Sequence, residues 1–580
     1  MSIRLSKFMV IVMLMAMMIS IVSGCGSSSS NASNSTQTSA ATQGTTTAQT
    51  TAAPTKEPVT LKYYDDQGAP VTITAGVQTD PVSAAMQKAT GVSLDWDTVQ
   101  NADRLNVMVA SGDLPDILAF SDRSKLENLI KSNALMELSA LVDSNGANIN
   151  AIGKNALAFS KDILSNKTGK LFAIPTRITV GSSTDVYFQP YVGFHIRWDY
   201  YKEIGKPAFN SYDDAAKALI DIQNKHPKTA DGKKTYGLSL WSDWGLWNYT
   251  VMSQIMCGIS SLGGAQIIMK DPDYNFIDGL NDAKAPIFVD GAFYNKLYRA
   301  GVLDPDSFTQ TNAQATAKME AGQEICQLAY WMVNGQNAAL STTGADYLSI
   351  PLNGGRYNCA GYNPVGGKYF VISKNCNAPD RAMDVLNWMY SDEGSRSMLN
   401  GAKDDTWTVD ASGKAVLTDK GINLKSDKDY VIHTGAGLYL NSTGIDPFSK
   451  DSTGKQFIDL FNEPDAQAKT LTAAQKEWLE NYGVQSTNDL WHKFGGYADN
   501  SAYNMLQQPQ SEDFKRTDAK IVTYLQTAIP KLIMAKTDEA FAKVKADIIK
   551  NVTAIDGYQA YMDEGKNIIA AAKAAGDKYK

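Results

Sequence analysis

The feature that most constrains the fold is a regular alternation of strand-like and helix-like segments from residue 59 onward. "VTLKYYD" and "VSLDWDTV" show the alternating apolar positions of strands, and "DPVSAAMQKAT" between them has helical spacing that ends at Gly91. The same alternation continues to "KYFVISKN" and beyond. It predicts an α/β fold with helices on both faces of its sheets. Roughly 520 residues follow the N-terminal region, enough for two lobes with their own cores.

Three further segments predict specific secondary structure. "TYGLSLW" (235–241) has the composition of a strand. "APDRAMDVLNWMYSDEG" predicts one amphipathic helix that begins near Asn377 and ends at Gly394. The Ala- and Lys-rich C-terminal segment, about 80 residues long, has apolar positions at helical spacing and predicts only helices.

The N-terminal region predicts export and lipid attachment. Arg4 and Lys7 precede an apolar run that is too short for a comfortable membrane span, which is typical of a secretion signal over residues 1–24. The "VSGC" that ends this region resembles a bacterial lipobox, so we expect a mature chain that begins at a lipid-modified Cys25. An ordinary secreted protein with a chance cysteine is the alternative.

Residues 25–58 have the composition of a flexible tether. Between Gly26 and Thr55 there is no charged residue, and Ser, Thr, Ala and Gln dominate. The whole chain has a formal net charge of -7 without a concentrated basic patch, which argues against a nucleic-acid partner. We therefore expect a monomer that its lipid anchor holds at the extracellular face of the cell membrane.

Motifs for catalysis, cofactors and metals are missing from the sequence. There is no phosphate-binding P-loop, no G-x-S-x-G elbow and no H-E-x-x-H, so we expect no cofactor. Adjacent carboxylates such as Asp65 and Asp66 usually mark solvated turns rather than a glycosidase pair. The four histidines lie at no ligand spacing. Whether disulfides form is open for the four cysteines after Cys25, which are Cys257, Cys326, Cys359 and Cys376.

Several phrases, in order along the chain, resemble the family 1 extracellular solute-binding proteins. They are "SGDLPDI" (Ser111–Ile117), "TGKLFAIPTR" (Thr168–Arg177), "IRWDYYKEIGKPAFNSYDD" (Ile196–Asp214), "GVLDPDSF" (Gly301–Phe308), "YFVISKNCNAPDRAMDVLNWMYSDEG" (Tyr369–Gly394) and "DDTW" (Asp404–Trp407). Each phrase is weak alone, but the ordered set behind a lipobox is specific. More narrowly, the chain is similar to the large lipoproteins that serve oligosaccharide ABC importers in Gram-positive bacteria.

The resemblance implies a two-lobed α/β fold of the periplasmic-binding-protein type, with hinge strands and a ligand cleft between the lobes. The N-terminal lobe would comprise residues 59–178 and about 368–425. The C-terminal lobe would comprise residues 179–367 and about 426–580, including a helical tail that wraps the hinge. The chain would cross near Ile174–Val180, return near Gly367–Ser373 and cross again later, through segments whose Gly and Pro residues can absorb a hinge rotation.

The resemblance also implies a function. The protein would capture an oligosaccharide or related polar solute and deliver it to an ABC permease when the cleft closes. A surface sensor of the same fold that feeds a receptor kinase is an alternative, and so is a polysaccharide-degrading enzyme. Relatives often carry a "D-x-D-G-N-G-K-x-D" calcium loop, but here the region is "HPKTADGKKTYGL". Because Asp231 is retained while Lys233 is cationic, we expect no calcium there.

"GLSLWSDWGLWNY" holds the leading candidates for a binding site. Sugars need flat rings to stack on and charged or amide groups for hydrogen bonds. Trp241, Trp244 and Trp247 supply three rings at a spacing that also fits one face of a buried helix. The Ser, Asp and Gly between them favour a loop after a strand, where ligands of open α/β sheets gather. We expect Trp244 to face the ligand and its neighbours to fix the loop.

Further candidates follow from the resemblance, each with a structural alternative. Trp331 at the end of the apolar "EICQLAYW" strand and Trp407 in the "DDTW" turn are either sugar platforms or core residues. Asp122 either binds ligand or caps the next helix. The remaining candidates are Asp65 at the end of the first strand, Phe120 and Arg123 beside Asp122, and Arg177 and Gln189 flanking the first crossing.

Overall fold

The computed structural model describes residues 57–69, 73–98, 102–180, 192–282, 284–340, 343–359, 365–424, 427, 429–499 and 506–579. The expected secretion signal, Cys25, nearly all of the tether and Gln189 lie outside these residues. Lys56–Lys580 forms one compact unit. Across the part of the chain that is described, no helix combines the length and apolarity needed to cross a bilayer.

A six-stranded mixed sheet is built from two distant parts of the chain. Its order is β2-β3-β1-β4-β13-β5. Strand β1 runs parallel to β3 and β4, whereas β13 is antiparallel to both β4 and β5. The bounds are β1 (Val59–Asp65), β2 (Gly76–Val77), β3 (Val92–Asp97), β4 (Ile117–Phe120), β5 (Ile174–Pro175) and β13 (Tyr369–Ile372).

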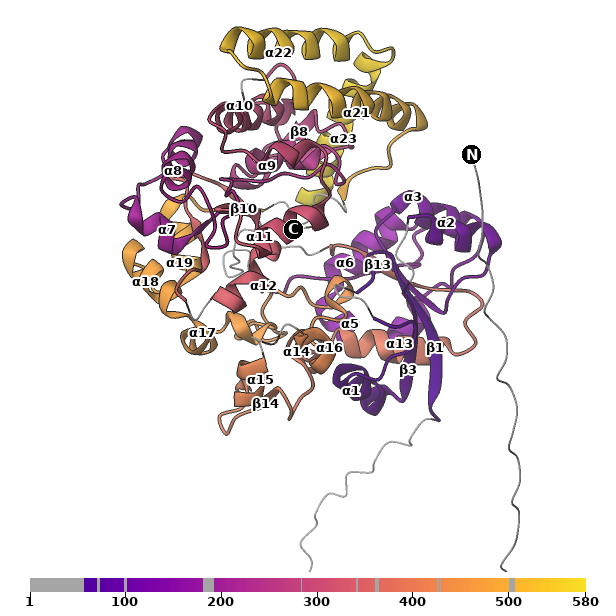
Figure 1. The fold of residues 1–580 in the computed structure, drawn as a ribbon. Helices are drawn as coiled ribbons and strands as arrows, with labels where there is room; N and C mark the ends of the chain where they lie inside the picture. Colours follow the sequence, from indigo (N-terminus) through magenta and orange to yellow (C-terminus); the bar gives the residue numbers. More distant parts are fainter. Residues whose placement is uncertain are drawn as a thin grey trace, which may run out of the picture. The chain divides into compact units, whose positions relative to one another are not determined.

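Helices cover both faces of this sheet, as the alternation predicts (Figure 1). Ile117 and Ala119 share one core cluster with α1, α4 and α13, whereas Leu118 and Phe120 share another with α2 and α3. The alternating contacts follow from the two-residue period of β4. The helices are α1 (Pro81–Thr90), α2 (Ala102–Ser111), α3 (Arg123–Lys131), α4 (Ser139–Asn145), α5 (Ala147–Ile152), α6 (Lys154–Phe159), α13 (Pro379–Met389) and α14 (Asp392–Asn400).

The single helix expected up to Gly394 is wrong, because the chain forms two helices there. Helix α13 ends at Met389, and Ser391 then caps α14 by accepting a hydrogen bond from the Gly394 amide at 2.9 Å. A serine that satisfies a free amide starts a new helix and so interrupts the apolar periodicity.

A second, three-stranded antiparallel sheet has the order β10-β6-β11. Its strands are β6 (Val192–Arg197), β10 (Cys326–Ala329) and β11 (Tyr347–Ile350), and the helices of this region are α7 (Trp198–Glu203), α8 (Tyr212–Lys225), α9 (Val251–Met256), α10 (Pro286–Arg299), α11 (Asn312–Glu320) and α12 (Tyr330–Leu340). The strand expected at 235–241 is wrong. Tyr236 bridges to Glu324 while Leu238 bridges to Leu303, so the segment contacts two different neighbours and no continuous ladder forms.

The C-terminal segment is helical, as expected. Helices α21 (Glu512–Ile533) and α22 (Asp538–Thr553) pack on each other, and α23 (Tyr558–Tyr579) follows (Figure 1). The last turn of α23 reaches the region of the first sheet, where Lys578 and Tyr579 both donate hydrogen bonds to Asp162 Oδ2, at 2.8 and 2.7 Å.

Shorter elements complete the described chain. They are β7 (Ser260–Leu262), β8 (Ile268–Lys270), β9 (Phe276–Asp278), β12 (Tyr357–Cys359), β14 (Trp407–Val409), β15 (Ala415–Leu417), β16 (Tyr497–Asp499), α15 (Asp419–Leu424), α16 (Tyr430–Thr434), α17 (Pro464–Thr470), α18 (Ala473–Tyr482) and α19 (Thr487–Phe494).

Three segments that are distant in sequence are hydrogen-bonded side by side at the expected crossings. The Thr176 amide donates to the Lys368 carbonyl at 2.9 Å, and the Ile178 amide donates to the Gly444 carbonyl at 2.9 Å. Gly366 has a φ of 81°, and a Cβ there would lie 2.4 Å from the Thr176 carbonyl oxygen, so only glycine fits. Two of these segments include residues of the crossings expected near 174–180 and 367–373, and the crossings and lobe boundaries stay predictions.

Candidate functional site

Four tryptophans meet at one place on the protein. Trp241, Trp244 and Trp247 come from the loop that precedes α9, and Trp331 comes from the first turn of α12. The ring centroids of Trp244 lie 5.4 Å from Trp241, 5.8 Å from Trp247 and 6.2 Å from Trp331. Trp247 is also 5.9 Å from Trp331. We call these four residues the tryptophan platform.

The platform has a buried base and an exposed surface. Trp241 is 2% exposed, whereas Trp244 is 42% and Trp331 41% exposed. The rings of Trp244 and Trp331 are stacked, with 18° between their planes, and both remain partly exposed to solvent. Exposed aromatic surface of this kind marks binding sites rather than cores. The buried-helix alternative is wrong, because residues 242–246 form turns and only Trp247–Tyr249 forms a 3-10 helix.

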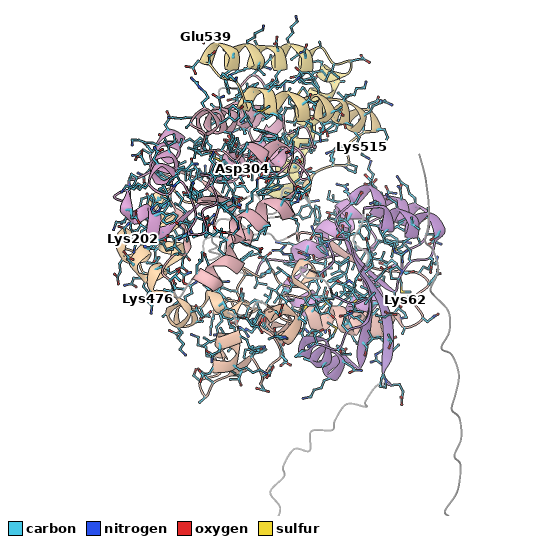
Figure 2. The ribbon with its side chains drawn as sticks, viewed as in Figure 1. Lys62, Lys202, Asp304, Lys476, Lys515 and Glu539 are labelled. Atoms are coloured by element: carbon cyan, nitrogen blue, oxygen red, sulfur yellow. The ribbon has the colours of Figure 1, made fainter. Side chains whose placement is uncertain are left out.

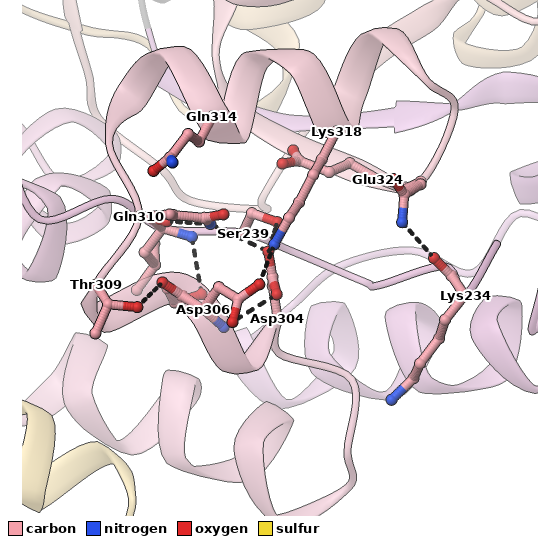
Figure 3. A network of polar contacts seen from close by, with 12 residues as sticks. Lys234, Ser239, Asp304, Asp306, Thr309, Gln310, Gln314, Lys318 and Glu324 are labelled. Atoms are coloured by element: carbon pink, nitrogen blue, oxygen red, sulfur yellow. Dashed lines mark hydrogen bonds and ion pairs between the residues drawn. The ribbon is translucent and has the colours of Figure 1, made fainter. Parts of the chain in front are cut away.

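A buried polar network holds the start of the tryptophan loop (Figure 3). Ser239 donates to Asp304 Oδ2 at 2.9 Å, and Gln310 Nε2 donates to the Leu240 carbonyl at 2.7 Å and to Asp304 at 3.1 Å. Lys318 Nζ completes the network with a 2.7 Å ion pair to Asp304. Asp304 is fully buried, unlike the surface lysines and Glu539 that are labelled with it in Figure 2.

Further hydrogen bonds tie the loop itself to its surroundings. The Ser242 amide donates to the Gln310 carbonyl at 2.9 Å, and Asp243 Oδ1 accepts a 2.8 Å hydrogen bond from the Asn312 amide at the start of α11. Asn248 Nδ2 donates to the Trp241 carbonyl at 2.7 Å. The rings are therefore fixed before any ligand arrives, which lowers the entropic cost of binding.

Glu324 lies close to this network and is also buried. Desolvation raises the pKa of its carboxyl to about 8, with a smaller contribution from the charge of Asp304. Gln327 Nε2 donates to its Oε2 at 3.1 Å. At neutral pH the side chain is therefore mostly protonated, which avoids an uncompensated buried charge beneath the platform.

Two of the predicted residues near the first sheet are buried. Asp65 is 2% exposed, accepts a hydrogen bond from the Gln67 amide at 2.9 Å and forms an ion pair with buried Lys368. Phe120 is completely buried, and its ring packs edge-to-face on Tyr369 at 5.2 Å. Both residues have intramolecular partners in this structure.

Asp122 and Arg123 have structural partners as well. Asp122 caps α3 by accepting a hydrogen bond from the Lys125 amide at 3.1 Å, which is the capping alternative. The Arg123 guanidinium donates to the carbonyls of Gln507 and Ile163, each at 3.2 Å. It therefore links α3 to two distant segments.

Arg177 and Trp407 lie apart from the platform. Arg177 pairs with Asp446 at 3.2 Å, next to the hydrogen-bonded crossing segments. Trp407 was expected in a turn, but it begins β14, where Nε1 donates to the Gly401 carbonyl at 2.9 Å. Its ring is 2% exposed in a separate cluster with Leu417. The strand expected to end at Trp331 stops at Ala329, so Trp331 is a helical residue.

Cysteines and acidic residues show no metal or disulfide chemistry among the described atoms. Cys257, Cys326 and Cys376 are free thiols, and the side chain of Cys359 is outside the description. Within the described ranges, no group of three or more His, Cys, Asp or Glu could hold a metal ion. In the segment "HPKTADGKKTYGL", where we expect no calcium, Lys233 Nζ pairs with Asp231 Oδ2 at 2.9 Å.

Sequence reasoning missed the residues that support the platform. Asp304 lies in the phrase "GVLDPDSF", which by itself assigns it no role, and Lys318 carries no motif. Their role depends on a contact between two loops and a helix. Lys368 adjoins a Gly-Gly pair at an expected crossing, which could have drawn attention to it. Tyr330 and Ser349, which line a cavity described below, look like ordinary core residues in sequence.

Comparisons with known proteins assign the family. The model of the bacterial extracellular solute-binding proteins matches residues 75–396. This span is more than half of the chain, so the protein belongs to the bacterial extracellular solute-binding proteins. Among curated proteins, none matches the sequence.

Solved structures with the same fold include three named as sugar binders. An HMO-binding, ABC-transporter-associated solute-binding protein from Bifidobacterium longum infantis is 13% identical, with a TM-score of 0.61. The alginate-binding protein AlgQ2 without calcium ion is 16% identical (TM-score 0.55), and the N-glycan transport solute-binding protein NgtS from Streptococcus pneumoniae is 14% identical (TM-score 0.54). Each alignment covers 89% of this chain and 99% of the other. The two-lobed solute-binding fold expected from the sequence is confirmed.

Proposed function

We propose that this protein captures an oligosaccharide on the tryptophan platform and delivers it to an ABC permease. The observation that carries the proposal is the near-parallel, exposed pair of Trp244 and Trp331 on a rigid base. The sugar ligands named for structures of the same fold support it. A sugar ring has a face of C–H bonds, which stacks on indole surfaces.

The size of the aromatic surface is sufficient for useful affinity. An aromatic side chain buries roughly 150–250 Å², so a ring half covered by a sugar contributes about 2–3 kcal/mol at about 25 cal/mol per Å², before ordering costs. Two such rings, Trp244 and Trp331, are exposed here. Polar partners proposed for the sugar hydroxyls remain Asp65, Arg123, Arg177 and Gln189, whereas Asp122 caps α3.

Most of these polar partners already hold intramolecular bonds. Asp65 pairs with Lys368, Arg123 with two carbonyls and Arg177 with Asp446. A ligand hydroxyl would join or replace these bonds. Phe120 and Trp407 contribute to the core in this structure.

Attachment to the cell surface and delivery to a permease complete the proposal. Lipid on Cys25 would hold the protein at the membrane, and the tether, uncharged from Gly26 to Thr55, would let the folded part move above it. Replacing Cys25 with Ala should release the protein into the culture medium, as measured by fractionation. A variant that stays in the membrane fraction would contradict lipid attachment.

A thermal-shift screen of the purified protein over mono- and oligosaccharides tests the binding function. A sugar that binds the folded state raises the melting temperature by mass action. We expect at least one oligosaccharide to do so at millimolar concentration, and the shift to disappear in Trp244→Ala. Failure of every sugar to raise the melting temperature would overturn the carbohydrate part of the proposal.

A further inference from the structure

A cavity of about 80 Å³ lies beside α12. Its lining includes Tyr330 and Asn337 from α12, the strand residues His195 and Ser349, and Gln475 and Trp478 from α18. His195 and Ser349 are directly opposite each other in the β6–β11 ladder, so both side chains lie on the same face of the sheet. The cavity is large enough for a substituent of a few heavy atoms.

One side chain that lines the cavity, Ser349, has a hydroxyl that could donate a hydrogen bond to a ligand. Ser349 is 6% exposed, and its Oγ is a buried hydroxyl without a hydrogen-bond partner among the described residues. Buried hydroxyls are nearly always satisfied, because an unmade hydrogen bond is costly. An external acceptor, such as a carbonyl oxygen, would satisfy this hydroxyl.

His195 offers an acceptor. Its Nδ1 contacts the Gln327 carbonyl at 3.1 Å, and a carbonyl can only accept, so Nδ1 carries the proton. Burial lowers the pKa of His195 to about 4, which keeps the ring neutral. In this tautomer Nε2 carries a lone pair and can accept a hydrogen bond from an N–H group.

The remaining walls select against charge and for a small apolar group. No Lys, Arg, Asp or Glu lines the cavity, so a carboxylate or phosphate would find no counter-ion. The rings of Tyr330 and Trp478 supply apolar surface, and Trp478 is fixed because its Nε1 donates to the Ser349 carbonyl at 3.1 Å. A donor, an acceptor and an apolar wall together match the carbonyl, N–H and methyl of an acetamido group.

The cavity is next to the tryptophan platform. Tyr330 lines the cavity, and its neighbour Trp331 stacks with Trp244, so both features share the first turn of α12. We propose that this cavity is a subsite for the acetamido group of an N-acetylated sugar unit in the bound oligosaccharide. The inference rests on the proposed function, because it names a class of sugar for the same site.

The test compares two disaccharides that differ in their acetamido groups. N,N′-diacetylchitobiose carries an acetamido group where cellobiose carries a hydroxyl, and their affinities for the full folded protein are measured by calorimetric titration. We expect diacetylchitobiose to bind at least about tenfold more tightly, because cellobiose leaves the Ser349 hydroxyl unsatisfied. Ser349→Val, which fills the cavity and removes the donor, should abolish that preference.

A matched control separates this effect from a general loss of stability. Ser160 is also buried, but its hydroxyl donates to the Ala173 carbonyl at 2.6 Å, distant in sequence from the platform. Ser160→Ala should lower the melting temperature and leave the preference for diacetylchitobiose unchanged. If Ser349→Val is unstable, Ser349→Ala provides the same comparison with a smaller change in volume.

Three outcomes would overturn the inference, and the cavity would then hold only water. They are equal affinity for the two disaccharides, an unchanged preference in both Ser349 variants, and no binding of either disaccharide. These outcomes differ from failure of the proposed function. If another sugar still raises the melting temperature and depends on Trp244, the tryptophan platform binds sugar and only the acetamido subsite is wrong.

Discussion

Two segments of the chain start with the same local pattern and end with different roles. Phe120-Ser121-Asp122-Arg123 follows β4, and Trp241-Ser242-Asp243-Trp244 follows the bridged segment around Leu238. In both, the first aromatic ring is buried and the aspartate accepts a hydrogen bond from a backbone amide near the start of a helix. The fourth residue differs, because Arg123 turns to carbonyl groups of the protein while Trp244 remains 42% exposed.

The difference arises from where the next helix begins. After Asp122 the chain enters α3 at once, so Arg123 becomes part of a helix that packs on the sheet. After Asp243 the chain makes further turns, with Gly245 at a φ of 65°, and no α-helix begins before Val251. This delay leaves the ring of Trp244 partly outside the core, where it meets Trp331. The late start of the next helix therefore distinguishes residues 241–244, the proposed binding segment, from residues 120–123, which we call the structural segment.

The largest expected effect is on folding of the structural segment. Phe120→Ala removes a completely buried ring and should destabilise the protein by about 3–5 kcal/mol. Chemical denaturation measures the loss. Sugar affinity of the remaining folded protein should stay within about twofold, since Phe120 contacts no part of the platform. A large loss of affinity at unchanged stability would make the two segments functionally alike.

The converse change in the binding segment should affect affinity more than stability. Trp244→Ala should weaken binding by about 2–3 kcal/mol, roughly 30- to 150-fold, because half of one indole would no longer cover the sugar. Calorimetric titration measures the affinity. The free protein should lose less stability than affinity, since 42% of Trp244 is already exposed to solvent. The opposite result would return Trp244 to the core.

The buried carboxyl beneath the platform should make stability depend on pH. Because the pKa of Glu324 rises from its ordinary value of 4.5 to about 8, the folded protein keeps a proton that the unfolded chain releases. Stability should therefore fall as pH rises from about 4.5 to about 8, by at most about 1.4 kcal/mol per pH unit from this group.

Glu324→Gln provides the check on this pH dependence. The amide cannot ionise, so denaturation curves of the variant should show a shallower fall over the same range. Part of the fall should persist, because burial also raises the pKa of Asp290 to about 7. A slope identical to that of the unmodified protein would show that Glu324 does not contribute to it.

The smallest expected effects concern Asp122 and Asp243, which occupy the same position in the two segments. Asp122→Ala removes the cap of α3 and should cost about 1 kcal/mol of stability, with unchanged sugar affinity. Asp243→Ala should cost a similar amount, but it also frees the tryptophan loop from Asn312 and should weaken binding several-fold. Parallel denaturation and titration of the two variants distinguish these roles, and equal effects on affinity would argue against them.

The sequence predicted much of the first sheet, because its strands and helices follow simple apolar periods. It also marked Trp244 through the Ser, Asp and Gly residues around it. It could not tell that Phe120 is buried while Trp244 is exposed, because the two rings have similar neighbours. Phe120 follows strand β4 and is followed two residues later by Asp122, whereas Trp244 follows the bridged segment around Leu238 and directly precedes Gly245. Burial of one and exposure of the other depends on which helix covers the ring.

The meeting of Trp331 with Trp244 could not be predicted from local pattern. Trp331 was expected at the end of a strand, but the strand stops at Ala329 and the helix begins immediately. Trp407 was also a candidate sugar platform from the sequence, yet its ring packs with Leu417 in a separate cluster. Long-range packing decides such cases, and only tertiary structure reveals it.

The central claim is that the exposed pair of the platform contacts sugar. The most direct measurement is a fluorine NMR titration of protein that carries 5-fluorotryptophan at its ten tryptophans, with the sugar that stabilises it most in the thermal-shift screen. Signals are assigned from single Trp→Phe variants. We predict that the signals of Trp244 and Trp331 shift to saturation while that of Trp407 stays in place. Saturable binding that leaves the signals of Trp244 and Trp331 unmoved would contradict the account.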